Sequence, residues 1–343
     1  MASDILIIQT AFAGDLILTT PLVAATAERF PDAAIDVLCI PGTAGLLNGN
    51  PHVRDVITYD KRKRDPGLPA MMRRLARTGY DLCLSPHRSF RSALLARATG
   101  APRRVAFDRT AAAWLYTHIV PYDTGAHEVD RNCSLLSALG ILSSPCGRPA
   151  LYPSRGDRAA ADAVLGRRDD RPLLCLAPGS VWATKRWTEE GFTALGRAFA
   201  DRFRIVLVGG PGDAALCTRI ADTLPEGTVD TAGRLSFLAS AALIGSARVL
   251  VSNDSAPVHI ASAMGTPVVE IFGATVPGFG FTPRGVAHRL VQRDDLSCKP
   301  CAIHGGAQCP IKTFECMRGL APDMVIRAVR DVLAETELLA GSE

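Results

Sequence analysis

The sequence predicts an α/β protein with two Rossmann-like, doubly wound domains that face each other across a cleft. Three observations predict this fold. The chain has 343 residues, enough for two domains at about 100–200 residues each. Short apolar runs alternate with helical patterns from residue 5 onward, and the same alternation begins again at residue 173. A stretch rich in Pro, Gly, Arg and Asp, at 143–172, separates the two series.

The predicted elements follow the order of βαβ units, which form parallel sheets. In the first half, strands at 5–8, 35–39 and 81–84 accompany a helix at 16–30. The second half has predicted strands at 173–177, 205–209, 249–251 and 268–272, and helices at 189–200, 214–224, 235–244 and 256–264. We therefore expect a first domain at 1–160, a second at 161–322, and a last helix within 323–343 that packs back on the first domain.

The composition excludes several classes of protein. Hydrophobic residues make up 48% of the chain and no period-three glycine pattern occurs, so the chain is neither disordered nor collagen-like. No apolar run approaches the roughly 18–20 residues of a transmembrane helix. The chain starts without a basic segment followed by an apolar one, and Cys39, Cys83 and Cys175 lie in predicted strands. We therefore expect a cytoplasmic protein with reduced thiols.

The net charge is only +4, but it is unevenly distributed. Residues 61–109 carry 13 Lys and Arg against three Asp, a balance of +10, so the remainder carries 4 − 10 = −6. This stretch indicates either an anionic partner or a solvated basic surface. Few aromatic residues and no nucleic-acid-binding motif accompany it. We therefore expect a phosphorylated lipid or an anionic sugar as the partner, and no nucleic acid.

Ligands of doubly wound sheets bind beyond the carboxyl ends of the strands, so the loops there are the candidate sites. No dinucleotide fingerprint or P-loop motif occurs in them, which argues against a dehydrogenase or an NTPase. After the first strand, Gly14 permits a tight turn and Asp15 begins a helix. Asp15 is either a helix-capping residue or a general base. Of the basic residues that follow the strand at 81–84 or its subsequent helix, some are expected to face an anionic acceptor; the candidates are His87, Arg88, Arg91, Arg103 and Arg104.

In the second half, three loops after strands carry groups suited to a nucleotide diphosphate. The loop after 173–177 supplies backbone N–H, hydroxyl and cationic donors from Gly179, Ser180, Thr184 and Lys185, and Thr188 is expected to cap the next helix. Asp213 either accepts from ribose hydroxyls or caps a helix. Asp254, Ser255 and Ala256 open a helix whose free N–H groups suit phosphate. His259, one turn further, is a sugar or phosphate contact or a structural residue.

Four late cysteines are spaced Cys298-x2-Cys301-x7-Cys309-x6-Cys316. Their number suits a zinc or iron site, but the spacing differs from that of zinc ribbons. Structural thiols, a metal site and a disulfide remain as three interpretations.

Three long segments together resemble glycosyltransferase family 9, the lipopolysaccharide heptosyltransferases: ILIIQTAFAGDLILTTPLVAATAERFPDAAIDVL, LAPGSVWATKRWTEEGFTALG and VSNDSAPVHIASAMGTPVVEIFGAT. A fourth, SCKPCAIHGGAQCPIKTFECM, looks most like the second heptosyltransferase of that pathway. The resemblance implies a GT-B fold with an acceptor domain followed by a donor domain. It also implies an inverting reaction without metal or cofactor, which transfers heptose from ADP-heptose to the inner core on lipid A at the inner face of the cytoplasmic membrane.

The resemblance also assigns site residues. Asp15 matches the catalytic base of the family, and the matching donor-binding residues are Thr184, Lys185, Asp254, Ser255, Ala256 and His259. The residue patterns described above add further candidates, which are Gly14, His87, Arg88 and Arg91 for the acceptor and Gly179, Ser180 and Asp213 for the donor. Three alternatives remain: another family 9 sugar transferase, a GT-B nucleotide-sugar epimerase, and a sugar-nucleotide-binding protein without catalysis.

Overall fold

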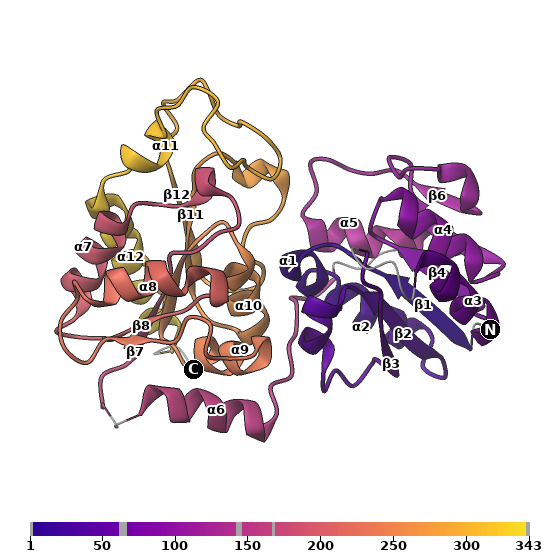
Figure 1. Ribbon diagram of the computed structural model, residues 1–343, viewed down its shortest axis with the longest axis horizontal. Coiled ribbons are helices and arrows are strands. Elements are labelled where there is room, and N and C mark those ends of the chain that lie inside the picture. The colour runs from indigo at the N-terminus through magenta and orange to yellow at the C-terminus, as the bar shows by residue number, and fades with distance from the viewer. Residues whose placement is uncertain (1–2, 62–66, 142–145, 167–168, 341–343) are drawn as a thin grey trace. The chain divides into compact units, whose positions relative to one another are not determined.

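The structure is a computed structural model that describes residues 3–61, 67–141, 146–166 and 169–340. It divides into two compact units, Met1–Tyr152 and Pro153–Glu343 (Figure 1). The boundary lies eight residues before the one we expected at 160/161. The reason is the helix α6 (Arg155–Leu165), which packs on α9 (Phe237–Gly245) and so belongs entirely to the second unit.

The first unit is built on a parallel six-stranded sheet in the order β3-β2-β1-β4-β5-β6. Its strands are β1 (Asp4–Ile8), β2 (Ala34–Cys39), β3 (Asp55–Thr58), β4 (Leu82–Ser85), β5 (Arg103–Phe107) and β6 (His118–Val120). Its α-helices are α1 (Ala13–Ile17), α2 (Thr20–Arg29), α3 (Leu68–Thr78), α4 (Phe90–Ala98) and α5 (Glu128–Ser134). The helices α3 and α4 pack together, as do α2 and α5. Ile5, Leu6, Ile7 and Ile8 are fully buried, as expected of a parallel strand covered on both faces.

The predicted helix at 16–30 is two helices, α1 and α2, separated by Leu18 and Thr19. Thr19 uses its hydroxyl to donate to the backbone oxygen of Asp15, at 2.8 Å. Pro21 stands in the first turn of α2, where a missing N–H group has no energetic cost. In the interior of one continuous helix, the same proline would remove a backbone hydrogen bond and interrupt the helix. The short α1 therefore ends soon after Asp15.

The second unit repeats the plan with a parallel sheet in the order β12-β11-β10-β7-β8-β9. Its strands are β7 (Leu173–Ala177), β8 (Arg204–Leu207), β9 (Val229–Asp230), β10 (Val249–Asn253), β11 (Val268–Phe272) and β12 (His288–Gln292). Besides α6 and α9, its α-helices are α7 (Glu189–Phe199), α8 (Ala214–Ala221), α10 (Ala256–Met264), α11 (Glu315–Arg318) and α12 (Pro322–Ala340). Both sheets have the Rossmann strand order, which confirms the predicted doubly wound class.

The last helix, α12, belongs to the second unit. It packs on β10, β11, β12 and α7. Val325, Val329 and Val332 are fully buried and join the core that also contains Phe192 of α7. We expected this helix to pack back on the first domain; its apolar stripe instead completes the core of the second unit, where it covers the sheet beside α7.

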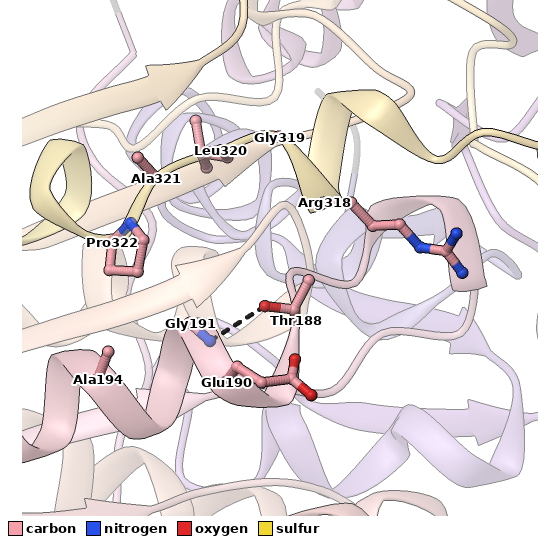
Figure 2. A pocket seen from close by; sticks show the side chains of 9 residues that line it. All are labelled: Thr188, Glu190, Gly191, Ala194, Arg318, Gly319, Leu320, Ala321 and Pro322. Atoms are coloured by element: carbon pink, nitrogen blue, oxygen red, sulfur yellow. Dashed lines mark hydrogen bonds between the residues drawn. The ribbon is translucent and has the colours of Figure 1, made fainter.

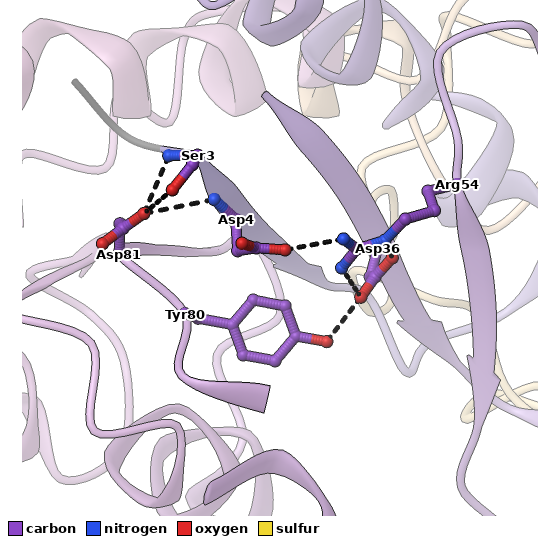
Figure 3. A network of polar contacts seen from close by, with 6 residues as sticks. All are labelled: Ser3, Asp4, Asp36, Arg54, Tyr80 and Asp81. Carbon is purple, nitrogen blue, oxygen red and sulfur yellow. Dashed lines mark hydrogen bonds and ion pairs between the residues drawn. The ribbon is translucent and has the colours of Figure 1, made fainter. Parts of the chain in front are cut away.

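Carboxylates at the amino edge of the first sheet are held in a polar network (Figure 3). Arg54 donates from Nε and one terminal nitrogen to the two oxygens of Asp36, at 2.8 and 2.7 Å, and from the other to Asp4, at 2.6 Å. The hydroxyl of Tyr80 donates to Asp36 at 2.7 Å. Asp81 accepts from the backbone and hydroxyl of Ser3 at 2.7 and 2.8 Å. These contacts tie the starts of β1 and β2 to the residues before β3 and β4.

Cys133 of α5 forms a disulfide with Cys146, so the expectation of reduced thiols is wrong for this pair. The two are only 13 positions apart, and the chain after α5 brings Cys146 back to that helix. Cys39, Cys83 and Cys175 are buried free thiols, as the predicted strands require. No helix in the described part of the chain is long and apolar enough to cross a membrane.

Candidate functional site

Each sheet has a point where its strand order reverses. In the first unit this point lies between β1 and β4, and in the second between β7 and β10. The loops at the carboxyl ends of such a strand pair diverge, and ligands bind in the crevice that they leave. The loops after β1 and β4 carry Asp15 and His87, and those after β7 and β10 carry Lys185 and Asp254. The predicted site residues therefore collect at the two reversal points, one in each unit.

Asp15 is the third residue of α1, and its Oδ2 accepts a hydrogen bond from the backbone N–H of Phe12 at 3.2 Å. The carboxylate thus supports the start of the helix, as the capping interpretation requires. It is also partly exposed at the carboxyl edge of the sheet. Its role as a base is compatible with this position and stays a prediction.

Asp15 interacts electrostatically with Glu128 and Tyr122, and these two residues contact Arg88 and Arg131. Sequence patterns did not single out three of these four residues and did not connect Arg88 with Asp15. The guanidinium carbon of Arg88 lies 4.1 Å from the centre of the Tyr122 ring, and that of Arg131 lies 5.0 Å from it. Arg131 Nε lies 3.0 Å from Glu128 Oε2. Tyr122 follows β6, and the other two missed residues belong to α5. More than 100 positions separate them from Asp15, and no local pattern marks them.

Burial sets the protonation of this cluster. It raises the pKa of Glu128 to about 7, with Arg131 and Arg88 opposing the shift and Asp15 adding to it. Burial also raises the pKa of Tyr122, and the negative charge of Glu128 adds to that effect. Asp15, Arg88, Tyr122, Glu128 and Arg131 therefore act on one another as a single charged group of residues, which we call the Asp15 cluster.

His87 is held by hydroxyl groups. Its Nδ1 lies 2.8 Å from the hydroxyls of Thr10 and Ser92 and 3.2 Å from that of Ser89. Burial, together with the charges of Lys61 and Arg88, lowers the pKa of His87 to about 4. The imidazole is therefore neutral at pH 7, and it ties the loop after β4 to β1 and α4. An anionic acceptor would meet a neutral ring here, not a cation.

The arginines that we expected near His87 lie at two different edges of the sheet. Arg91 is exposed on α4, beside the carboxyl edge. Arg103 and Arg104 are the first two residues of β5, so they lie at the amino edge, away from Asp15. Arg104 donates to the backbone oxygens of Leu115 and Ala101. Our expectation was wrong for these two, because we did not recognise β5, whose start they form.

In the second unit the predicted donor residues form a connected group. Lys185 Nζ lies 2.7 Å from Asp254 Oδ2, and the hydroxyl of Thr275 donates to the same oxygen at 2.6 Å. The side chains of Lys185 and Asp254 are 13% and 9% exposed. Thr184 is fixed from the other side, since its hydroxyl bonds both the N–H and the oxygen of Gly306, at 2.8 and 3.0 Å.

Gly179 lies directly against Asp213. A Cβ atom at Gly179 would lie 2.3 and 2.5 Å from the Asp213 carboxylate oxygens, so only glycine fits beside this side chain. Asp213 also accepts from the N–H of Gly210 at 3.0 Å, as the capping alternative requires. The backbone oxygen of Ser180 accepts a hydrogen bond from Arg186 Nε at 2.8 Å, within the loop after β7. The close approach of Gly179 to Asp213 brings the loops after β7 and β8 together.

The helix α10 begins at Ala256 with Ser255 before it. The Ser255 hydroxyl lies 3.1 Å from the oxygen of Asn253 and makes no cap hydrogen bond to the helix. The first N–H groups of α10 are therefore not capped by this hydroxyl. His259 is buried within the helix, with 5% of its surface exposed. Thr188 caps α7 by accepting from the N–H of Gly191 at 3.0 Å, as predicted.

Glu270 is a further residue that the sequence analysis missed. It is the middle residue of β11 and is fully buried. Neither carboxyl oxygen has a hydrogen-bond partner among the described residues. Burial raises its pKa well above the usual value, and the nearby charge of Asp254 adds to this effect while Lys185 opposes it. A glutamate in the middle of an apolar strand was the available signal. Burial therefore favours the neutral form of Glu270, which lies within electrostatic reach of the Lys185–Asp254 pair.

The late cysteines are free thiols: Cys309 and Cys316 are buried, and Cys298 and Cys301 are half-buried. Within the described ranges, no three His, Cys, Asp or Glu side chains form a group that could hold a metal ion.

A pocket elsewhere in the second unit lies between the start of α7 and the turn from α11 to α12 (Figure 2). Its lining includes Thr188, Glu190, Arg318 and Pro322. None of the predicted donor residues lines it, so it is separate from the site at β7 and β10.

A family model described as glycosyltransferase family 9 (heptosyltransferase) matches residues 69–311, more than half of the chain. The chain belongs to glycosyltransferase family 9. It is therefore a glycosyltransferase of the heptosyltransferase family, and the matched region includes Arg88, Lys185 and Asp254. Asp15 precedes the matched region.

Known relatives of this family 9 glycosyltransferase include lipopolysaccharide heptosyltransferase 3 of Escherichia coli. It is 30% identical over 282 residues, which cover 77% of this chain and 82% of the relative. Lipopolysaccharide heptosyltransferase 2 of E. coli K12 is 25% identical over 299 residues, covering 80% and 84%. The structure of E. coli ADP-heptose LPS heptosyltransferase II has a TM-score of 0.82 at 23% identity, covering 97% of this chain and 99% of that one.

These comparisons confirm the predicted GT-B fold with its two parallel α/β domains. They do not support our preference for the second heptosyltransferase, because a relative named heptosyltransferase 3 shares 30% of its residues with this chain and heptosyltransferase 2 only 25%. The cysteine-containing segment on which that preference rested is short compared with the whole alignment.

Proposed function

We propose that this family 9 glycosyltransferase is an inverting heptosyltransferase. It transfers heptose from ADP-heptose to the inner core of lipopolysaccharide, onto Kdo or heptose attached to lipid A. The names of the relatives support this proposal, and ADP-heptose is named for the similar E. coli structure. The observation that carries it is the pairing of Lys185 with Asp254 at the reversal point of the second sheet, a cation held where a diphosphate would bind.

The donor site follows from these contacts. Thr275 holds Asp254, and Asp254 holds Lys185 with its ammonium group at the carboxyl edge of β7 and β10. The start of α10 adds backbone N–H donors and the positive end of the helix dipole. As ADP leaves, the diphosphate gains negative charge, which these fixed donors stabilise. Asp213, on the neighbouring loop beside Gly179, is placed to accept from the ribose hydroxyls.

The transfer step assigns Asp15 the role of base. The acceptor hydroxyl oxygen attacks the anomeric carbon from the face opposite the diphosphate, and a new C–O bond forms. The bond from that carbon to the phosphate oxygen breaks, and ADP leaves with the electron pair. The hydroxyl proton passes to the Asp15 carboxylate. Arg88 and Arg91 bind carboxylates or phosphates of the acceptor through paired N–H groups, and Gly14 and His87 shape the same loops.

Peripheral contact with the inner face of the cytoplasmic membrane completes the proposal. Phe90 on α4 and Trp114 on the adjoining 3-10 turn (Ala113–Leu115) are 53% and 79% exposed. Exposed aromatic side chains beside cationic ones suit a membrane interface. Lys61 is exposed in the same unit. Residues 62–64 of the same basic stretch, which we also propose to meet lipid headgroups, lie outside the described residues.

An assay with and without acceptor tests the function. The purified protein is incubated with ADP-heptose alone, with a delipidated acceptor that ends in Kdo, and with one that carries a first heptose. ADP release that depends on acceptor supports transfer, and the better acceptor identifies the position. An isomerised donor without acceptor would indicate an epimerase. Donor binding without either product would indicate a binding protein. Release only with another nucleotide sugar would indicate a different family 9 transferase.

A further inference from the structure

Glu128 and Arg131 form a buried ion pair at the start of α5. Glu128 is 8% exposed and Arg131 is 3% exposed, and the charged atoms are 3.0 Å apart. Removing two charges from water is costly, and an apolar pair of similar volume often stabilises a protein at least as well. Stability alone therefore does not explain why charged residues stand here.

The pair connects Glu128 to the acceptor side through Tyr122. The guanidinium of Arg131 packs on the Tyr122 ring, and the guanidinium of Arg88 packs on the same ring, with carbon-to-centroid distances of 5.0 and 4.1 Å. Attraction between a cation and an aromatic face holds each guanidinium in place. Arg88, which we assign to the acceptor, is thus positioned on a ring that Arg131 also contacts.

Glu128 interacts electrostatically with residues on four parts of the first unit. Arg131 lies on its own helix, Asp15 on α1, Arg88 after β4, and Tyr122 after β6. Burial raises the pKa of Glu128 to about 7, Arg131 and Arg88 oppose the rise, and Asp15 increases it. Glu128 therefore passes between its neutral and charged forms near neutral pH. Because Coulomb coupling is mutual, its charge state changes the proton affinity of Asp15.

We propose that Glu128 is a positioning residue for the transfer reaction, a role that rests on the proposed function. Through Arg131 and Tyr122 it fixes the position of Arg88, and its negative charge makes Asp15 a better proton acceptor. With Glu128 ionised, two carboxylates balance two guanidinium groups in the cluster. When it is protonated, the cluster gains a net positive charge and the proton of the acceptor hydroxyl passes less readily to Asp15.

Glu128→Gln keeps the shape of the side chain and removes its charge. With a soluble delipidated acceptor, we expect kcat to fall about 10-fold, less than for loss of the base itself. ADP affinity should not change, because the donor residues lie in the other unit. The wild-type enzyme should gain activity as the pH rises through about 7, and this rise should disappear in the variant. Glu128→Asp should restore part of it.

The matched control is Glu335→Gln, which breaks an exposed ion pair with Arg289 on the second unit and should leave kcat and the pH profile unchanged. Wild-type kcat in Glu128→Gln would contradict the proposal. So would a lowered kcat with the rise near pH 7 intact, since that pattern indicates a merely structural role.

A second measurement does not depend on turnover. The Tyr122 phenol, assigned by comparison with Tyr122→Phe, is titrated by its ultraviolet absorbance. It should ionise at lower pH in Glu128→Gln, because a nearby negative charge that disfavours the phenolate is gone. An unchanged titration would show that the Glu128 charge does not reach the cluster and would overturn the inference. A wild-type enzyme that transfers no heptose would instead overturn the proposed function, and the two failures are thereby distinct.

Discussion

The two edges of the first sheet use the same kinds of side chain for different purposes. At the amino edge, Asp36 accepts hydrogen bonds from Nε and one terminal nitrogen of Arg54 and from the Tyr80 hydroxyl. At the carboxyl edge, Asp15 and Glu128 share their surroundings with Arg88, Arg131 and Tyr122. In the first network, close hydrogen bonds satisfy the buried carboxylate and join four parts of the chain. In the second, guanidinium groups rest on an aromatic ring and a carboxyl group titrates near neutral pH.

This difference indicates that the amino-edge network stabilises the fold, whereas the carboxyl-edge cluster is suited to catalysis. A carboxylate with short, matched hydrogen bonds is held in its charged form and stabilises the fold. A carboxyl group for which the cost of burying the charge exceeds the stabilisation by nearby cations and hydrogen bonds has a raised pKa. It can then change its protonation near neutral pH, which is a property of reactive sites. Substitutions at the amino edge should therefore lower stability and leave turnover unchanged. Substitutions at the carboxyl edge should lower turnover and leave stability nearly unchanged.

The largest effect is expected at Asp15. Asp15→Asn should lower the rate of transfer by about 10²–10⁴, as expected for loss of a general base, and should leave ADP affinity near that of the wild type. Single-turnover transfer and a calorimetric titration with ADP measure the two quantities. Turnover close to wild type would return Asp15 to the role of a helix-supporting residue.

Lys185 extends the comparison to the second unit, where a close ion pair lies at a carboxyl edge. Lys185→Ala should weaken ADP binding by about 1.5–3 kcal/mol, the contribution of a hydrogen bond to a charged group, or roughly 10- to 100-fold in Kd. Turnover should fall as well, because the lost cation contacts the diphosphate before and during departure. Unchanged ADP affinity by titration would mean that the Lys185–Asp254 pair is structural.

Asp36→Ala tests the amino edge. The variant removes the acceptor of two Arg54 hydrogen bonds and of the Tyr80 hydroxyl. We expect the free energy of unfolding to fall by about 2 kcal/mol, near the value for leaving buried partners unsatisfied, because the Arg54 side chain is 44% exposed and can be solvated. Urea denaturation measures the loss. The kcat of the folded variant should stay at the wild-type value; a large loss of kcat would break the distinction between the edges.

Substitution of Glu270 is expected to have the smallest effect, and it should raise the free energy of unfolding, whereas Asp36→Ala lowers it. Its folded pKa is well above the usual value because of burial, so the folded state binds more protons than the unfolded state above about pH 4.5. Wild-type stability therefore decreases as the pH rises through that range. Glu270→Gln removes this dependence and should raise stability by on the order of 1 kcal/mol at neutral pH. Denaturation at pH 5 and pH 8 checks that the gain grows with pH; a gain independent of pH would contradict the assigned cause.

Much of the fold could be predicted from local pattern. The predicted strand at 173–177, the helix at 256–264 and the strand at 268–272 coincide with β7, α10 and β11. Buried parallel strands appear as short apolar runs, and each is followed by a loop at a known edge, so Asp15, Lys185 and Asp254 could be assigned to carboxyl ends. The strand β5 was missed because two arginines begin it. The helix α12 was expected to pack on the first domain, because the apolar stripe of a helix does not indicate which surface it covers.

By itself, the sequence determined the doubly wound class, the loops that carry the candidate site and the family that the motifs resemble, because strand and helix periods and turn residues are local properties. Tertiary structure alone decided which charges meet. It placed Glu128, Arg131 and Tyr122 around Asp15, joined Lys185 to Asp254, and left Glu270 buried next to that pair. The physical reason is that burial and Coulomb interaction depend on distances in space. Residues far apart in the chain come close to one another only when the sheets are assembled.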